Sequence, residues 1–515
     1  MKRSMIGKIA VVAMSAVIAL GIGFALPKDL KADEVTPEVA GNTIPTATTT
    51  YADKTCYGEI TADNKIDYWK ITIPSSGRIK FTINFGSYFK WQFYNSDEEC
   101  LWDNSYSGEN RLWIDLNKGT YYLRIAKRDY SDYGTYNFYY KFLPSGESFG
   151  ETGKGTNNLI SQANTIGLGK VYNAFIADND EIDYYKFTLN APGKINMVAN
   201  NPEDLYVTYY ILDKNGDTEY GDGWTYTSPG ENKNSIVLSK GVHYIEFIRR
   251  NNRTGAFNFK IDFEGIKFSD TVKTVVCGSQ AQLSVDNAGR NKITWTSSNK
   301  SVAQVSSEGV LMANKAGPVT IMATVDGTTI KRNIQVLYKD VTDPDKFWYE
   351  PTNALTNKGI VQGYDRQTTF KPENNCTRAQ MVTFLWRLKG TPNPKASTTK
   401  FKDVKKNAYY FKAVIWATER GITTGYSKTS FKPNNVCTRA QTVTFLWRMA
   451  GKPTPKTTTN KFKDIGKKDY FYKAVLWASE KKIVEGYSNK TFRPQNKCTR
   501  RQMVTFLYKY SKNVK

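Results

Sequence analysis

The chain has 515 residues, of which 40% are hydrophobic and 14% aromatic, so it is long enough for about three to five folded domains. Its formal net charge of +24 is confined to one segment: residues 341–515 contain 35 Lys and Arg against 11 Asp and Glu, and the rest is balanced. Six cysteines in so long a chain exclude a scaffold built on disulfides.

The basic C-terminal segment predicts a polyanionic partner, because an excess of positive charge raises the local concentration of anions. Nucleic acid, anionic lipid and acidic polysaccharide all meet this description. The N-terminal residues narrow this choice.

The N-terminus predicts a secretory signal peptide over residues 1–32. A basic start (MKR) precedes an apolar run from Ile9 to Leu26, and small residues follow with a cleavage site after Ala32. A retained membrane anchor is the alternative, because a run of this length can just span a bilayer. Cleavage of the signal peptide is favoured over a retained anchor because glycines make the apolar run less hydrophobic. Export argues against nucleic acid, and we expect no membrane span after cleavage.

Two β-rich domains, 41–145 and 157–265, are predicted from a long internal repeat. The segment ITADNKIDYWKITIPSSGRIKFTIN (60–84) aligns with IADNDEIDYYKFTLNAPGKINMVAN (176–200). Apolar and polar residues alternate in both and turn residues interrupt them, which is typical of half-buried antiparallel strands in a sandwich. The stretch 144–158, rich in Gly and Ser, is predicted to link the two domains.

These two domains resemble the bacterial pre-peptidase C-terminal domain. The resemblance rests on Asp67-Tyr68 and Asp183-Tyr184, on Gly77 and Gly193, and on the L-x-K-G turns at 116–119 and 238–241. It implies two jelly-roll-like β-sandwiches of a kind often appended to secreted proteins.

The second β domain contains one candidate metal site. The sequence ADNDEID (177–183) could hold calcium through Asp178, Asp180 and Asp183, although it lacks the Gly and the distal Glu of an EF-hand loop. A polar hairpin turn is the alternative. No other cofactor is expected.

Residues 266–338 are predicted to form a third, smaller sandwich. The run ITWTSSNKSVAQVSSEGVLMANKAG (293–317) resembles the bacterial Ig-like domain of group 2, with Trp295, Val302, Val305 and Val310 on the expected inner face. The resemblance implies a module that spaces or presents other domains.

The C-terminal third repeats one phrase at intervals of 61 residues: CTRAQMVTFLWR (376–387), CTRAQTVTFLWR (437–448) and CTRRQMVTFLYK (498–509). Each phrase is predicted to begin the second helix of a helix–loop–helix unit. In the middle unit the first helix has one apolar face, formed by Tyr410, Ala413, Val414 and Ala417. In the first unit Pro351 is expected at the first helical position.

Each repeated phrase also predicts a capped helix start. The Thr and the Gln three residues later form a capping box; the pairs are Thr377–Gln380, Thr438–Gln441 and Thr499–Gln502. The preceding Cys376, Cys437 and Cys498 are expected to be buried apolar residues and not metal ligands. Cys56 and Cys100 lie in one domain and could pair.

The arginine after each capping Thr is not explained by helix stability, because a helix N-terminus favours acidic residues. Arg378, Arg439 and Arg500 occupy this position. A salt bridge to a neighbouring unit would be a purely structural role. Three occurrences at one register in a basic segment favour an anion site that binds carboxylate or phosphate in a bidentate manner.

The three units, assigned to 339–396, 397–457 and 458–515, resemble S-layer homology domains, whose pattern is F-x-D-V, an A-V helix, G-x-x-x-G-Y, F-x-P and T-R-A-E. The resemblance implies an α-helical triplet with pseudo-three-fold symmetry. It further implies binding of an anionic, often pyruvylated, secondary polysaccharide of a Gram-positive-type cell wall.

The resemblance assigns the anion contacts to the three arginines. The supporting loop residues are Gly363, Tyr364, Gly425, Tyr426, Gly486 and Tyr487. The aspartates of F-x-D-V are Asp340, Asp403 and Asp464. For them a structural cap role is expected at least as strongly as a role in anion binding. Gln replaces the family's Glu in all three copies and Arg501 replaces Ala, so both departures raise the positive potential.

We therefore expect a multidomain chain, all-β and then α-helical, that acts as a non-catalytic, exported cell-surface protein. Its N-terminal sandwiches would be adhesive or structural modules with further surface glycans or proteins as partners. The alternatives are a secreted hydrolase of proteins or glycans with the same wall anchor, and a general polyanion binder. Against an enzyme, the modules fill the chain, and the single histidine, His243, has no catalytic motif around it and is expected to be a sheet residue.

Overall fold

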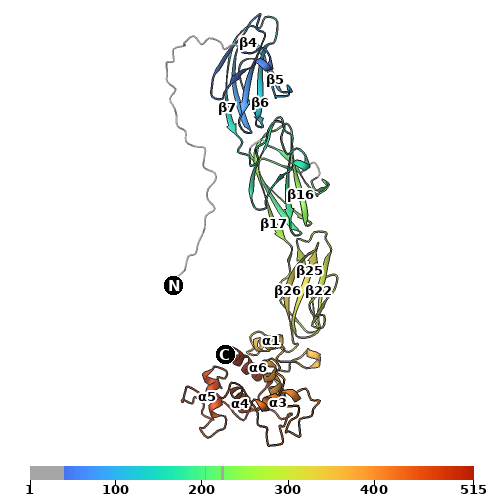
Figure 1. Ribbon diagram of the computed structural model, residues 1–515, viewed down its shortest axis with the longest axis vertical. Helices are drawn as coiled ribbons and strands as arrows, with labels where there is room; N and C mark the ends of the chain where they lie inside the picture. The colour runs from blue at the N-terminus through green and yellow to red at the C-terminus, as the bar shows by residue number, and fades with distance from the viewer. Residues whose placement is uncertain (1–39, 203–204, 222–224, 515) are drawn as a thin grey trace.

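The computed structural model describes residues 40–202, 205–221 and 225–514. Three β-sandwiches follow one another in a column, and a helical unit lies at the C-terminal end (Figure 1). This arrangement confirms the predicted multidomain fold class. The predicted signal peptide lies outside the described residues. Within the described part, each helix is too short or too polar to cross a bilayer.

The first sandwich is organised by one long bent hairpin. Its elements are the 3-10 turn Ile44–Thr46, β1 (Thr48–Thr50), β2 (Cys56–Ile60), β3 (Ile66–Ile73), β4 (Gly77–Tyr94), β5 (Cys100–Leu116), β6 (Gly119–Lys127) and β7 (Gly134–Pro144). Strand β4 pairs with β5 along its length, with β7 over its first half and with β6 over its second. The hairpin thus joins both layers around a core that includes Trp69, Trp91 and Phe138.

The second sandwich consists of two separate sheets. Its elements are the 3-10 turn Ile160–Gln162, β8 (Asn164–Thr165), β9 (Val171–Ile176), β10 (Ile182–Leu189), β11 (Gly193–Asn201), β12 (Val207–Leu212), β13 (Thr218–Tyr220), β14 (Tyr226–Thr227), β15 (Gly230–Leu238), β16 (Gly241–Arg249) and β17 (Gly255–Gly265). One sheet has the order β13-β12-β16-β10-β8, with β14 beside β12, and the other has β15-β11-β17-β9. Strands β3 and β10 alternate between buried and partly exposed residues in the same order, as the internal repeat predicts.

The Ig-like sandwich shares its core with the helical unit. Its strands are β18 (Lys267–Phe268), β19 (Thr274–Val276), β20 (Gln280–Gln282), β21 (Val285–Asp286), β22 (Ile293–Ser297), β23 (Ala303–Val305), β24 (Val310–Ala313), β25 (Gly317–Val325) and β26 (Thr328–Leu337). Val336, Tyr338 and Phe370 belong to one buried cluster that spans both units. The Tyr338 hydroxyl accepts from Gln367 Nε2 at 2.7 Å, and the Ala316 amide donates to the Gln367 carbonyl at 2.9 Å.

The helical unit closes on itself. Its elements are α1 (Tyr349–Asn357), the 3-10 turn Asp365–Gln367, α2 (Arg378–Leu388), α3 (Phe411–Glu419), α4 (Arg439–Met449), α5 (Tyr472–Glu480) and α6 (Arg500–Asn513). Helix α2 packs on α3, α4 on α5, and α6 on α1, so the second helix of each repeat contacts the first helix of the next. Pro351 is the third residue of α1, not the first as predicted. The first-turn amides have no intrahelical acceptor, so proline is tolerated there as well.

The three cysteines of the repeated phrase meet at the centre of this unit. The amide of Cys376 donates to the carbonyl of Cys498, that of Cys437 to Cys376, and that of Cys498 to Cys437, each at 2.9 Å. All three side chains are fully buried, which confirms their predicted structural role. Cys56 and Cys100 do not form a disulfide: Cys56 is buried and Cys100 is exposed.

Candidate functional site

The first two copies of the repeated phrase form complete capping boxes, and the third copy forms one of the two contacts. The Thr377 amide donates to Gln380 Oε1 at 3.1 Å, and the Gln380 amide donates to Thr377 Oγ1 at 3.3 Å. The second copy has the same two contacts, at 3.3 and 3.2 Å. In the third copy the Thr499 amide donates to Gln502 Oε1 at 3.3 Å, whereas the Thr499 hydroxyl has no hydrogen-bond partner.

Each arginine of the phrase reaches into the next repeat. Nε of Arg378 donates to the carbonyl of Phe431 at 2.9 Å, and Nε of Arg439 donates to that of Phe492 at 2.9 Å. Nε of Arg500 closes the circle by donating to the carbonyl of Phe370 at 2.8 Å. A capped helix start therefore fixes the guanidinium against the F-x-P loop of its neighbour, and the contact is to the backbone rather than a salt bridge.

The three guanidiniums are buried. Their side chains are among the few buried charged groups, at 4%, 4% and 2% exposure in chain order. Within the part of the chain that the structure describes, none of them forms a salt bridge, and Nη2 of Arg378 has no hydrogen-bond partner. Burial lowers the pKa of Arg378 and Arg439 from the usual arginine value, yet arginine stays charged at neutral pH.

Arg500 lines a pocket of about 230 Å³ between repeats. The pocket lining combines residues of all three units, namely Gln362, Gly363, Tyr364, Gln380, Thr383, Phe384, Arg387, Tyr409 and Arg500. The Arg500 guanidinium carbon lies 4.7 Å from the centroid of the Tyr364 ring. The predicted arginine and a Gly-Tyr loop thus meet, but the arginine belongs to the third repeat and the loop to the first.

Of the other two arginines, one repeats this contact with a tyrosine and the other does not. Arg439 lies 5.0 Å from the Tyr487 ring, which repeats the arrangement of Arg500 and Tyr364. The rings beside Arg378 are Phe431 and Phe445, at 4.8 and 5.4 Å. Tyr426 is 58% exposed, and its ring contacts Lys432 Nζ at 3.6 Å. The sites at Arg439 and Arg500 therefore share a tyrosine beside the guanidinium, whereas the site at Arg378 has phenylalanines and its loop tyrosine is turned to solvent.

The glycines of the Gly-Tyr loops are required by close packing. A Cβ on Gly363 would lie 2.4 Å from the Tyr338 ring, and one on Gly425 would lie 2.4 Å from Phe401. Gly425 also has φ of 94°, which favours glycine. These residues shape the loop that carries the tyrosine.

The aspartates of F-x-D-V hold the F-x-P loops in place. Asp340 accepts from the amides of Phe370 and Lys371, both at 2.7 Å. Asp464 accepts from Phe492 and Arg493 in the same way. Each carboxylate therefore fixes the loop whose carbonyl accepts from an arginine, and this is a structural role.

Replacing Asp403 by Asn should lower the free energy of unfolding by about 1–2 kcal/mol at pH 7. Its carboxylate accepts from the amides of Phe431 and Lys432 and from the Ser430 hydroxyl at 2.7–2.8 Å. Burial opposes ionisation, but these donors outweigh it and hold the pKa of Asp403 below its usual value. The stabilisation is thus present above the usual aspartate pKa, near about 3.9, and is lost as the pH falls through the lower folded value.

Denaturant unfolding at pH 7 and pH 3 measures the difference in the free energy of unfolding between the wild type and the Asp403 variant. This difference should be smaller at pH 3. Asp345→Asn, which changes an exposed residue, is the control. A difference of equal size at both pH values would contradict the role of the ionised carboxylate.

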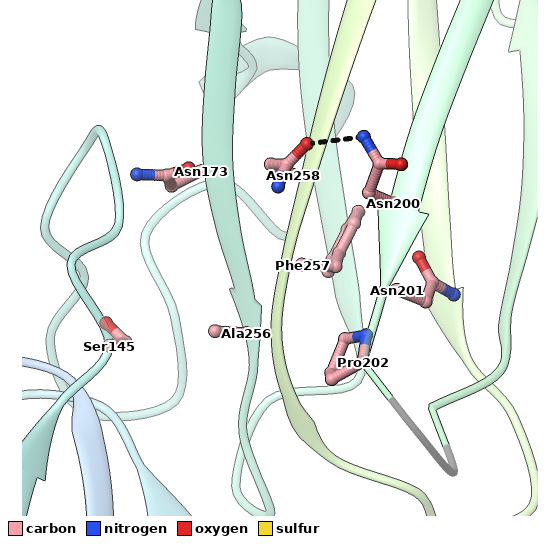
Figure 2. A pocket seen from close by; sticks show the side chains of 8 residues that line it. All are labelled: Ser145, Asn173, Asn200, Asn201, Pro202, Ala256, Phe257 and Asn258. Carbon is pink, nitrogen blue, oxygen red and sulfur yellow. Dashed lines mark hydrogen bonds between the residues drawn. The ribbon is translucent and has the colours of Figure 1, made fainter. Parts of the chain in front are cut away.

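A pocket on the second sandwich and the single histidine are the two further features that an enzyme could use in catalysis. An amide-rich pocket of about 380 Å³ lies on the second sandwich, where Asn200 Nδ2 donates to Asn258 Oδ1 at 3.1 Å (Figure 2). Its lining includes Asn173 and Asn201 but no acidic residue, histidine or cysteine.

His243 pairs with Phe187 across β10 and β16, as predicted for a sheet residue, and its ring nitrogens contact Glu219 Oε2 and the Ser239 carbonyl.

Sequence comparisons identify the helical unit and the domain before it. The profile of the S-layer homology domain matches residues 337–382, 400–443 and 461–504. The chain carries three S-layer homology domains. The profile of the bacterial Ig-like domain (group 2) matches residues 262–336. Both predicted domain types are confirmed.

Similar proteins share only part of their length with this chain. A cellulosome-anchoring protein of Acetivibrio thermocellus is 32% identical over 145 residues, which are 27% of this chain and 32% of that protein. An endoglucanase of a Bacillus species is 34% identical over 126 residues, or 24% and 13% of the two chains. The chain thus spans about a third or less of these relatives. The pre-peptidase C-terminal domain of a collagenase from Bacillus anthracis matches 21% of this chain and all of that domain, with 18% identity and a TM-score of 0.18.

Several residues of the pocket at Arg500, which lies between the S-layer homology domains, were not predicted from the sequence. Arg387 donates from Nη2 to Gln362 Oε1 at 2.9 Å, and Tyr409 comes from the second repeat. A signal for Arg387 was present, because a basic residue ends all three repeated phrases. Tyr409 has an aromatic counterpart at Tyr470 in the next repeat, so the repeat register could also have revealed it.

Proposed function

We propose that the three S-layer homology domains anchor this protein to an anionic secondary polysaccharide of the cell wall. The observation that carries the proposal is the set of three buried guanidiniums that have no carboxylate partner among the described residues. A buried charge without a counterion is costly, so a carboxylate or phosphate that enters beside it is strongly favoured. The pocket at Arg500 offers space for such a group.

The composition of this pocket suits a charged sugar. Tyr364 and Tyr409 provide ring faces, Gln362 and Gln380 provide amides, and Arg500 provides the charge. Sugar rings pack on aromatic faces, and a carboxylate substituent such as a pyruvate ketal would pair with the guanidinium. The surrounding excess of Lys and Arg steers a polyanion toward the domain.

The S-layer homology domains indicate an exported, cell-wall-associated protein, as the sequence predicts. In our proposal the Ig-like domain spaces the two N-terminal sandwiches from the wall, and these act as non-catalytic adhesive or structural modules. A wall-anchored hydrolase is the second candidate, because an endoglucanase is among the similar proteins. Hydrolysis of a protein or glycan by the purified chain would favour it.

Co-sedimentation with purified wall fragments tests the proposal. Residues 33–515 should pellet with intact fragments and remain in the supernatant when the secondary polysaccharide has been extracted. Equal pelleting with both preparations would contradict it. Binding to DNA or heparin with the same affinity and a steep salt dependence would instead show a general polyanion binder.

Gln380 determines the direction of its hydrogen bond with the Tyr364 hydroxyl. Its Oε1 accepts from the Thr377 amide, so Nε2 faces Tyr364 and donates to the hydroxyl at 2.6 Å. The hydroxyl proton is therefore free to donate to a bound anion. Glu at this position, as in the family pattern, would accept that proton instead and would add a negative charge.

Replacing Gln380 by Glu should weaken binding of the anionic polysaccharide roughly tenfold, because a like charge is placed beside the ligand. Calorimetric titration measures the change. Gln304→Glu, on an exposed residue of the Ig-like domain, adds the same charge away from the pocket and is the control. Unchanged or tighter binding by the Gln380 variant would refute this role.

A further inference from the structure

A groove crosses from the second sandwich to the first on their outer surface. The amide-rich pocket of the second sandwich shares three lining residues, Ser145, Pro202 and Ala256, with another pocket of about 300 Å³. That pocket extends to Arg78 and Leu143 of the first sandwich. The two pockets therefore form one continuous groove, which we call the joint groove.

A pair of amides lies in the joint groove on the second sandwich. Asn200 of β11 lies opposite Asn258 of β17, and Asn200 Nδ2 donates to Asn258 Oδ1 at 3.1 Å (Figure 2). Among the residues that the structure describes, Asn200 Oδ1 and Asn258 Nδ2 have no hydrogen-bond partner. The pair therefore offers one acceptor and one donor to a ligand.

The linker between the sandwiches turns this part of the sheet surface into a pocket. Asn173 of β9 lies opposite Asn258, and its Nδ2 donates to the Gly146 carbonyl at 3.1 Å. The backbone amide of Asn173 donates to Ser148 Oγ at 2.9 Å. The linker is thus held against the edge strand β9 and supplies Ser145 to the pocket.

The first sandwich has an equivalent amide pair without this contact to the linker. Asn84 Nδ2 donates to Asn137 Oδ1 at 3.0 Å, at the same register of the internal repeat. The strand beside Asn137 presents Tyr57 where the second sandwich has Asn173. The pair by itself is therefore a feature of both sheets, and the joint groove is what distinguishes the second.

The first sandwich presents an exposed tryptophan beside the joint groove. Trp113 of β5 is 59% exposed, although tryptophan is largely buried in most proteins. The Arg78 guanidinium carbon lies 5.1 Å from the centroid of its ring and Lys80 Nζ lies 5.8 Å from it. Because Arg78 also lines the groove, the ring stands close to its end.

The joint groove carries no net charge. Its two charged residues neutralise each other, because Arg78 donates from Nε and Nη2 to the two carboxylate oxygens of Asp115 at 2.8 and 2.7 Å. The other lining residues are uncharged. The groove therefore differs from the basic C-terminal segment and favours a neutral ligand rich in hydrogen-bonding groups.

We propose that the joint groove and Trp113 bind a neutral polysaccharide chain, an inference that rests on the proposed adhesive role of the two sandwiches. Sugar hydroxyls both donate and accept, which matches the free atoms of Asn200 and Asn258. The apolar face of a sugar ring packs on an exposed aromatic ring such as that of Trp113. The groove joins these two contacts, so the ligand is a chain that extends across both sandwiches.

This assignment gives the two ends of the molecule different ligands. The joint groove lies between the two N-terminal sandwiches, whereas the S-layer homology domains lie at the other end of the column (Figure 1). The protein would then connect the anionic polymer of its own wall to a neutral glycan outside it.

Affinity electrophoresis of residues 33–515 tests the proposal in gels that contain hydroxyethylcellulose, xyloglucan, galactomannan or dextran. We expect at least one of these neutral polymers to retard the chain. Trp113→Ala and Asn258→Asp should each weaken that binding roughly tenfold. Asn258→Asp keeps the shape and still accepts from Asn200, so it removes only the free donor. Migration unaffected by all four polymers would overturn the proposal.

Two matched variants separate binding from structure. Trp102→Ala removes another exposed tryptophan of β5, which pairs with Phe93 in the opposite layer. Asn137→Asp makes the same change in the equivalent amide pair of the first sandwich. Both should bind like the wild type. Full binding by the Trp113 and Asn258 variants would contradict the assignment.

Two further measurements identify the kind of failure. Arg500→Ala should keep its binding of the neutral polymer, and the Trp113 variant should still pellet with wall fragments, so each proposal can fail without the other. Retention on immobilised gelatin that is lost in the Trp113 and Asn258 variants, without retardation by any polysaccharide, would show a surface for extended peptides and overturn the glycan assignment.

Discussion

Replacing Arg500 by Ala should weaken binding of the wall polysaccharide at least tenfold and lower the free energy of unfolding of the helical unit by about 2–4 kcal/mol. Nε of Arg500 donates to the carbonyl of Phe370 and an Nη donates to that of Gln362, both at 2.8 Å. The substitution leaves both carbonyls without these donors and removes the charge from the pocket. Calorimetric titration and denaturant unfolding measure the two effects.

Two further variants separate binding from stability. Arg500→Lys keeps the charge but cannot reproduce the forked contacts, so it should retain more affinity than the alanine variant. Arg420→Ala removes the same charge from an exposed position and should change neither quantity. An Arg500→Ala chain that is destabilised but binds with full affinity would show that the arginine is only structural.

Residues 338–515 should unfold at a temperature about 10 °C lower than residues 262–515, which corresponds to a loss of about 3–5 kcal/mol. The buried cluster that contains Tyr338 and Phe370 continues into Val336 and Ile334 of the Ig-like domain. A cut at residue 338 exposes this surface and removes the hydrogen bond from Ala316 to Gln367.

Thermal unfolding followed by circular dichroism measures the difference. Residues 157–515, which lack only the first sandwich and most of the linker, should keep the melting temperature of the helical unit. Equal melting temperatures for 338–515 and 262–515 would show that the S-layer homology domains fold independently of the Ig-like domain.

Local patterns allowed much of the fold to be predicted. The alternation in β3 and β10, the capping boxes at Thr377 and Thr438, and the buried face of α3 all follow from residues close together in the chain. The same is true of the buried cysteines. Each of these features depends on a periodicity or a short spacing that the sequence displays directly.

Contacts between distant segments could not be predicted in this way. Arg500 meets the loop of the first repeat because three repeats close into a ring, a property that no single repeat shows. Glu151 of the linker lies beside Asp180 and Asp183, with one oxygen of each within 4.8 Å of the others, and no local pattern shows this contact. The sequence grouped Asp178 with Asp180 and Asp183, whereas in the structure Asp178 Oδ2 accepts from the amide of Asp115 in the first sandwich.

Binding of residues 33–515 to the purified secondary polysaccharide can be measured before and after chemical reduction of the carboxylates of the polymer. We expect saturable binding to the native polymer and a loss of at least tenfold in affinity when the charge is removed, because the buried arginines then lose their counterion. Equal affinity for the charged and the neutral polymer would contradict it.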